Sequence, residues 1–240
     1  MQHSDLTGSS SVRDSIATAT LRVDMIADLV CPWCYLGKRR LDAALAAVYG
    51  PSTLRWLPFQ LNPGMPADGM GFEEYLASKF GDPARVQPGL DELTRAGLAE
   101  GIRFRFDLMK RVPNTLDAHR LMQHAAGEGA STARVAEGLL SGFFEEGLDI
   151  ADRDVLADIG GNHGLSRPGV LRALEDESGR AQVLAREAEV RRGGVTGVPD
   201  FLINDRLFVV GAQPTAVLVD AFDRAMFGED GEQPVSESLH

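Results

Sequence analysis

The sequence contains few residues that could bind a metal or form disulfides. Its 240 residues include two cysteines, Cys31 and Cys34, and five histidines. A chain of this length can bury an apolar core without stabilising disulfides. We therefore expect one domain, or one domain that carries a large insertion.

Long apolar runs and an excess of positive charge are also missing. No apolar segment approaches the roughly 18 residues that a membrane-spanning helix needs. The net charge is −11, which argues against a nucleic-acid-binding surface because phosphates are bound by clustered Lys and Arg. The one basic cluster, residues 38–40, falls inside a predicted helix. We expect neither a membrane nor a nucleic acid as a partner.

Both ends of the chain are polar. Residues 1–20 are rich in Ser and Thr and lack the apolar segment of a secretory signal, and residues 229–240 are acidic. We expect both segments to be flexible termini, and we expect the protein to be cytoplasmic.

The cysteine pair lies in the segment DLVCPWCYLGKRR and allows three interpretations. A structural disulfide between Cys31 and Cys34 would close a very small loop and restrain the unfolded chain little. A structural zinc site usually needs four Cys or His ligands. His119 and His124 are five residues apart, about 140° around a helix, so they do not share a face. We predict no metal site and favour the third interpretation, a redox pair.

The sequence around the pair supports that interpretation. The apolar stretch LRVDMIADLV precedes it as a predicted strand, and a helical stripe follows at Leu41, Ala44, Leu45 and Val48. Pro32 suits the first turn of that helix, where its missing N–H is not needed. Cys31 would then lie at the helix N-terminus, where free amides and the helix dipole stabilise a thiolate. Cys34, one turn further and less exposed, would resolve a mixed disulfide.

The rest of the chain reads as one more strand, a long helical stretch and a final β-β-α unit. Residues 53–61 predict a strand, and residues 65–192 show only helical periodicity. Residues 198–205 and 206–212 predict a hairpin with Asn204-Asp205 at its turn. We interpret the Phe and Met stripes of the helical stretch as core and see no cofactor site in them. One stripe is Phe72, Tyr75, Leu76 and Phe80. Another belongs to a helix that Ser131 is expected to cap, and it comprises Val135, Leu139, Leu140, Phe143 and Phe144.

This order of elements predicts an α/β protein with a thioredoxin fold and a large all-helical insertion. The thioredoxin-like domain is discontinuous and comprises residues 21–64 and 193–228. Residues 65–192 form the helical insertion subdomain.

Four segments together resemble the DsbA-like thioredoxin family: CPWCYLGK, FQLNP, PNTLDAHRL and GVTGVPDFLIND with the later GAQP. The FrnE-like branch, related to 2-hydroxychromene-2-carboxylate isomerases and kappa-class glutathione transferases, is the most similar. The resemblance implies that Val198-Pro199 is a cis-proline loop beside the cysteines. It also implies that Asn114 and His119 line a groove that faces the pair.

The same resemblance sets the expected chemistry. The isomerases and kappa-class transferases have a serine at the position of Cys31 and bind glutathione there. Since this chain keeps both cysteines, we predict a thiol-disulfide oxidoreductase with Cys31 as nucleophile and Cys34 as resolving residue. Pro199 would complete the catalytic site, and Pro32, Trp33 and Val198 would contact the substrate. The Pro-Trp dipeptide places no positive charge beside the thiolate, so we expect a less oxidising couple than the most oxidising thioredoxin-like proteins have.

Two alternatives stay open. One is a glutathione-dependent isomerase or transferase, in which Cys31 positions the thiol and Cys34 is dispensable. The other is a non-catalytic, chaperone-like binding module. We expect protein or small-molecule thiols and disulfides as partners, and no cofactor apart from glutathione as a candidate co-substrate. A homodimer is a candidate assembly.

Overall fold

The computed structural model describes residues 20–81 and 85–228. The two predicted flexible termini therefore lie outside the described residues, apart from residue 20. Within the part that is described, no helix is both long and apolar enough to cross a membrane.

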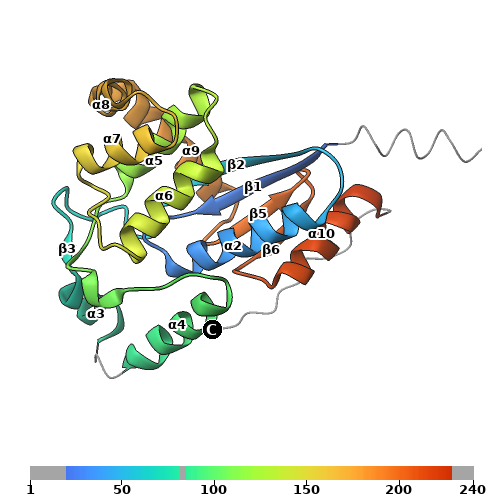
Figure 1. Ribbon diagram of the computed structural model, residues 1–240, viewed down its shortest axis with the longest axis horizontal. Helices are drawn as coiled ribbons and strands as arrows, with labels where there is room; N and C mark the ends of the chain where they lie inside the picture. The colour runs from blue at the N-terminus through green and yellow to red at the C-terminus, as the bar shows by residue number, and fades with distance from the viewer. Residues whose placement is uncertain (1–19, 82–84, 229–240) are drawn as a thin grey trace, which may run out of the picture.

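A four-stranded mixed sheet forms the centre of the thioredoxin-like part (Figure 1). Its strand order is β2-β1-β5-β6. Strand β1 pairs in parallel with β2 and antiparallel with β5, which continues antiparallel into β6. The strands are β1 Leu21–Ala27, β2 Ser52–Pro58, β5 Asp200–Ile203 and β6 Leu207–Val210.

The turn between β5 and β6 follows from two residues that tolerate left-handed backbone. Asn204 and Asp205 have φ angles of 50° and 55°. Positive φ at both central positions gives the turn whose twist matches that of a hairpin, and Asn and Asp adopt it most readily after Gly. The Asn204 side chain also accepts a hydrogen bond of 2.8 Å from the backbone N–H of Arg22 at the start of β1. The predicted hairpin is confirmed.

Two helices cover one face of the sheet. Helix α2, Pro32–Ala47, lies beside the C-terminal helix α10, Thr215–Phe227 (Figure 1). Alternate residues of β1 and β5 point at these helices and are fully buried, because successive side chains of a strand face opposite sides. The buried residues of this cluster include Val23, Met25, Phe201, Ile203, Leu41, Leu218 and Phe222. This core fixes the N-terminus of α2 against the sheet.

The insertion is mostly helical, as predicted. Its helices are α3 Phe72–Phe80, α4 Gln87–Ala99, α5 Leu116–Gly127, α6 Thr132–Phe144, α7 Arg153–Asn162, α8 Arg167–Glu175 and α9 Glu177–Arg192. The prediction of helix alone was wrong in one detail, since β3, Met70–Gly71, pairs antiparallel with β4, Arg111–Val112. Strands of two residues are too short to leave a period in the sequence.

A continuous apolar core joins the insertion to α2. The α6 residues predicted as a buried stripe, Val135, Leu139, Leu140, Phe143 and Phe144, are all buried in it together with Tyr35 and Leu36 of α2. Ser131 caps α6 as predicted, accepting a hydrogen bond from the N–H of Arg134.

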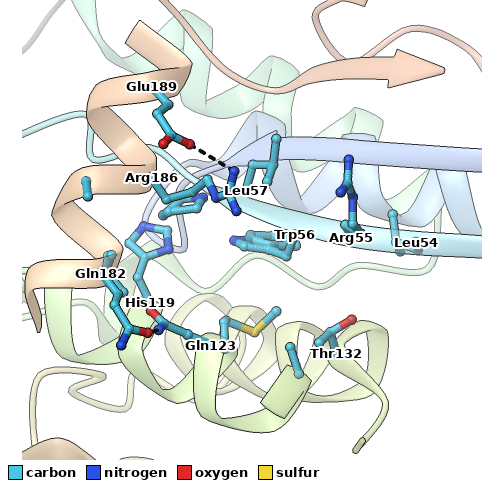
Figure 2. A pocket seen from close by; sticks show the side chains of 15 residues that line it. Leu54, Arg55, Trp56, Leu57, His119, Gln123, Thr132, Gln182, Arg186 and Glu189 are labelled. Carbon is cyan, nitrogen blue, oxygen red and sulfur yellow. Dashed lines mark hydrogen bonds and ion pairs between the residues drawn. The ribbon is translucent and has the colours of Figure 1, made fainter. Parts of the chain in front are cut away.

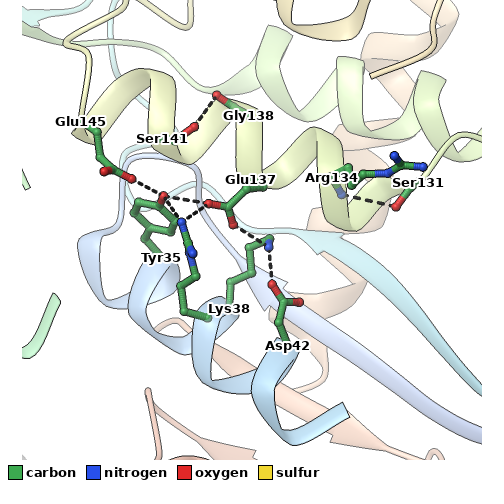
Figure 3. Close-up of polar contacts among 10 residues, drawn as sticks. Tyr35, Lys38, Asp42, Ser131, Arg134, Glu137, Gly138, Ser141 and Glu145 are labelled. Atoms are coloured by element: carbon green, nitrogen blue, oxygen red, sulfur yellow. Dashed lines mark hydrogen bonds and ion pairs between the residues drawn. The ribbon is translucent and has the colours of Figure 1, made fainter. Parts of the chain in front are cut away.

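The basic cluster of residues 38–40 joins the two parts by ion pairs, and Figure 3 shows those of Lys38. Lys38 Nζ is buried and lies 2.6 Å from Asp42 and 2.8 Å from Glu137 on α6. Arg39 pairs with the same glutamate at 2.6 Å. The Tyr35 hydroxyl contacts Glu137 and lies 2.5 Å from Glu145. These cations are therefore paired within the protein rather than presented to phosphates.

Candidate active site

Cys31 occupies the N-cap position of α2, with Pro32 in the first turn. Its carbonyl accepts hydrogen bonds from the N–H groups of Cys34 and Tyr35, at 3.0 and 3.2 Å. Both cysteines are free thiols, and they are 3% and 0% exposed. The predicted order of exposure holds, although Cys31 shows only a small surface.

The two thiols differ in their surroundings. Burial raises the pKa of Cys34 well above its ordinary value, and the hydrogen bond and charge of Cys31 raise it further. Burial disfavours any anion in the protein interior. Cys34 therefore keeps its proton in the reduced protein.

The Val198-Pro199 bond is cis and adjoins the pair, as the resemblance implied. The Cys31 thiol lies 3.7 Å from the carbonyl oxygen of Val198 and donates to it. Gly37 allows helix α2 to lie close to Pro199, since a Cβ at this position would lie 3.0 Å from Cγ of Pro199. A side chain at Gly37 would push α2 away from the proline.

A groove of about 370 Å³ opens beside Cys31. Cys31, Pro32, Trp33 and Val198 line one side of it. The other side comes from the insertion, including Phe72, Tyr75, Leu76, Phe80 and Leu90. The interpretation of the 72–80 stripe as core was wrong, because α3 contains no buried residue and its apolar face lines this groove. Apolar periodicity shows which face of a helix avoids water, but not whether protein or a ligand covers it.

Asn114 and His119 do not line this groove, so that expectation needs correction. The Asn114 side chain accepts from the N–H of Leu116 at 3.0 Å and donates to the carbonyl of Met65 at 2.7 Å. It holds the start of α5 and ties it to the loop after β2. His119 is buried and lines a second cavity, beside β2 (Figure 2).

Sequence reasoning missed a buried carboxylate near the cysteines. Asp28 is 0% exposed and accepts hydrogen bonds from the N–H groups of Leu29 and Leu61. Its backbone hydrogen bond lowers the pKa of Cys34, whereas its charge, the smaller of the two effects, raises it. Its Oδ1 atom lies 3.3 Å from Nε2 of His119, without the alignment of a hydrogen bond. The sequence does contain a signal for this residue, because Asp28 lies three positions before Cys31 and directly after a buried strand.

The described residues contain no group of three or more Cys, His, Asp or Glu side chains placed to hold a metal ion. The site presents a pair of thiols. Cys31 lies at a helix N-terminus with a small exposed surface, and Cys34 is fully buried. This arrangement suits thiol-disulfide exchange.

Comparison with known proteins agrees with this geometry. The model of the DSBA-like thioredoxin domain matches residues 22–223. The crystal structure of a probable DsbA oxidoreductase, SCO1869 from Streptomyces coelicolor, is similar with a TM-score of 0.79 and 30% identity. The match covers 89% of this chain and 93% of that one.

Two more distant structures share the fold. A 2-hydroxychromene-2-carboxylate isomerase matches with a TM-score of 0.64 and 20% identity, over 85% of this chain and 95% of its own. The cytosolic disulfide reductase DsbM from Pseudomonas aeruginosa, solved with glutathione, matches with a TM-score of 0.58, 21% identity and the same coverage. The family model matches most of the chain, and the cysteine pair and the cis-proline loop agree with it. The chain therefore belongs to the DsbA-like thioredoxin domain family.

Proposed function

We propose that the protein is a thiol-disulfide oxidoreductase in which Cys31 is the nucleophile and Cys34 the resolving cysteine. The observation that carries the proposal is the placing of the Cys31 sulfur, at the start of α2 and 3.7 Å from the Val198 carbonyl. Helix N-termini stabilise a thiolate through free amides and the helix dipole.

The exchange runs in two steps. The Cys31 thiolate attacks one sulfur of a substrate disulfide, so that a mixed disulfide forms and the other substrate sulfur leaves as a thiolate. Cys34 then loses its proton and attacks Cys31, and the second substrate thiolate leaves. The substrate gains two electrons and the protein ends with a Cys31–Cys34 disulfide. The reverse sequence oxidises a dithiol.

The raised pKa of Cys34 fits its place in this sequence. While Cys31 is a free thiol or thiolate, its hydrogen bond and charge add to the effect of burial in raising the pKa of Cys34. Once Cys31 enters a mixed disulfide, its sulfur can no longer carry a negative charge. The charge of Cys31 then no longer raises the pKa of Cys34. Burial still raises the pKa of Cys34, so we expect the second step to depend more on pH than the first.

The groove supports disulfides flanked by apolar groups as substrates. Its helical wall consists of the apolar side of α3 together with residues of α4, and Trp33 adds an aromatic ring on the cysteine side. Pro32, Trp33 and Val198 are the proposed substrate contacts, and the main chain of Val198 is suited to pair with an extended segment. Both peptides and small organic disulfides match this chemistry.

Glutathione is a second candidate for this groove. The isomerase and the glutathione-bound reductase with the same fold motivate it. A glutathione-dependent isomerase or transferase would need Cys31 but not Cys34, whereas complete exchange needs both. We further propose a cytoplasmic location and a place in the FrnE-like branch.

A redox titration followed by mass spectrometry tests the proposal. The oxidised protein should lose two protons between Cys31 and Cys34, and both thiols should return on reduction. A pair that stays reduced under every oxidising condition would reject exchange as the function. Activity that survives Cys34→Ser and requires glutathione would favour the isomerase or transferase type.

A further inference from the structure

A second cavity, of about 470 Å³, lies along strand β2 (Figure 2). Five consecutive residues of β2, from Leu54 to Pro58, form one wall, and helices α5 and α9 form the others. Among the described strands β2 pairs only with β1, so the cavity follows its outer edge. Within residues 20–81 and 85–228, no residue lines both this cavity and the cysteine groove.

Two side chains of this cavity carry buried nitrogen atoms that make no hydrogen bond to any described residue. They are Nε1 of Trp56 and both ring nitrogens of His119, although Nε2 of His119 lies near the Asp28 carboxylate, at 3.3 Å. The His119 side chain is 0% exposed. Figure 2 shows the nitrogen edge of the Trp56 ring turned toward His119 across the cavity. Buried polar groups are almost always hydrogen-bonded, and an unpaired one costs about 1–3 kcal/mol.

The remaining walls combine apolar surface with polar side chains such as Gln123 and Gln182. Leu54, Leu57, Met122 and Val183 contribute apolar surface. A cavity of this size would hold on the order of ten waters, and those against the apolar surface would lack hydrogen-bond partners there. A ligand that combines a flat apolar body with a polar group would cover these walls and satisfy both side chains.

The polar groups select the chemistry of that ligand. The indole N–H of Trp56 only donates, so the ligand must accept there. Nε2 of His119 lies 3.3 Å from the Asp28 carboxylate, so Nδ1 is the ring nitrogen left to donate to the ligand. Arg186, ion-paired with Glu189 at 2.9 Å, adds a cation at the wall. A carboxylate has one oxygen for each of the two unpaired donors.

We propose that this cavity binds a small aromatic carboxylate of one or two rings. Its carboxylate accepts from Trp56 and His119, and its rings lie against Leu54, Leu57, Met122 and Val183. The site is separate from the cysteine groove, and it does not depend on the proposed redox function.

The chain offers a direct test because it has two tryptophans, Trp33 in the cysteine groove and Trp56 in the cavity. The probe is naphthalene-2-carboxylate, and naphthalene-2-carboxamide is its uncharged counterpart. In protein labelled with ¹⁵N at tryptophan, two indole N–H signals are assigned with Trp33→Phe. The probe should shift the Trp56 signal saturably, and calorimetry should show the carboxylate binding at least tenfold tighter than the carboxamide.

Two alanines one turn apart on α9 give a matched pair of variants. Ala185 lines the cavity and Ala181 does not, and both are exposed. Ala185→Phe should weaken probe binding at least tenfold, whereas Ala181→Phe should bind like the wild type. His119→Leu, which keeps an apolar side chain but removes the imidazole, should also weaken binding at least tenfold.

Three results would overturn the proposal. They are a shift confined to the Trp33 signal, wild-type affinity in Ala185→Phe, and equal affinities for the carboxylate and the carboxamide. Absence of saturable binding at millimolar probe concentration would likewise reject the site.

Discussion

The two sides of the cysteine groove are held in place very differently. On the thioredoxin side, Cys34 and Phe201 are 0% exposed and pack in the core between the sheet, α2 and α10. On the insertion side, α3 has no buried residue and its Phe80 is 50% exposed. The thioredoxin wall is fixed by core packing. The insertion wall has buried Phe143 and Phe144 at its base, but its α3 part is an apolar surface on a lightly packed helix.

This difference suggests a division of work. Thiol-disulfide exchange needs sulfur atoms at defined positions, which a packed core provides. Apolar contact with a substrate is non-directional and needs only accessible apolar area. We therefore expect the thioredoxin side to set the chemistry and the insertion side to set substrate preference.

The largest expected effect comes from the thioredoxin side. Cys31→Ser should lower disulfide reduction by at least about a hundredfold for every substrate, because a hydroxyl is a far weaker nucleophile than a thiolate at neutral pH. Initial rates with an apolar peptide disulfide and with glutathione disulfide would measure it. A loss limited to one substrate would contradict the division of work.

A smaller and selective effect is expected on the insertion side. Leu76→Ala removes apolar contact area and should raise KM for the apolar peptide disulfide about three- to tenfold, with kcat little changed. Glutathione disulfide should be reduced at the wild-type rate. Leu98→Ala is the control, since Leu98 is exposed at 60% on α4 and outside the groove. Equal loss with both substrates would show that α3 supports the chemistry itself.

The ion pairs between α2 and α6 connect the two sides and should affect stability rather than exchange. Burial alone would raise the pKa of Glu137, but the charge and hydrogen bond of Lys38, with Tyr35 and Arg39, lower it below its ordinary value of 4.5. Glu137→Gln should lower the free energy of unfolding at pH 7 by about 2 kcal/mol, because buried Lys38 then keeps only Asp42.

The sign of the pH effect follows from that lowered pKa. The contribution of Glu137 is complete above its unfolded-state pKa and is lost as the pH falls through the folded value. Urea unfolding should therefore show the difference between wild type and Glu137→Gln shrinking below about pH 4. A difference that is constant from pH 7 to pH 3 would argue against the ion pair.

The smallest effect is expected at Asp200, which follows the cis-proline on the thioredoxin side. Burial raises its pKa to about 7, against the opposing hydrogen bond from the N–H of Gly211. The folded protein thus binds a proton that the unfolded chain has already released, and stability falls as the pH rises toward and through 7. Between pH 5 and pH 8 the wild type should lose on the order of 1 kcal/mol that Asp200→Asn does not lose. Parallel pH profiles would contradict the assignment.

The same contrast explains what the sequence could and could not predict. The cysteine pair, the Asn204-Asp205 turn and the Ser131 cap depend on local chemistry, and all three were found. Residues distant in sequence decide what covers the apolar face of a helix. The sequence pattern alone therefore assigned the stripe from Phe72 to Phe80 to the core, whereas it lines the groove. His119 was placed in the cysteine groove by resemblance, whereas packing around α5 turns it toward β2. Asp28 escaped notice because its role depends on Leu61 and His119, which are distant in sequence.

Trapping the mixed disulfide tests the central claim most directly. Cys34→Ser should accumulate a mixed disulfide between Cys31 and one half of an apolar peptide disulfide, seen by mass spectrometry as a mass increase equal to that half-peptide. The wild type should show the adduct only transiently, because Cys34 resolves it. If the variant forms no adduct at Cys31, or the adduct persists equally in the wild type, the assignment of nucleophile and resolving cysteine is wrong.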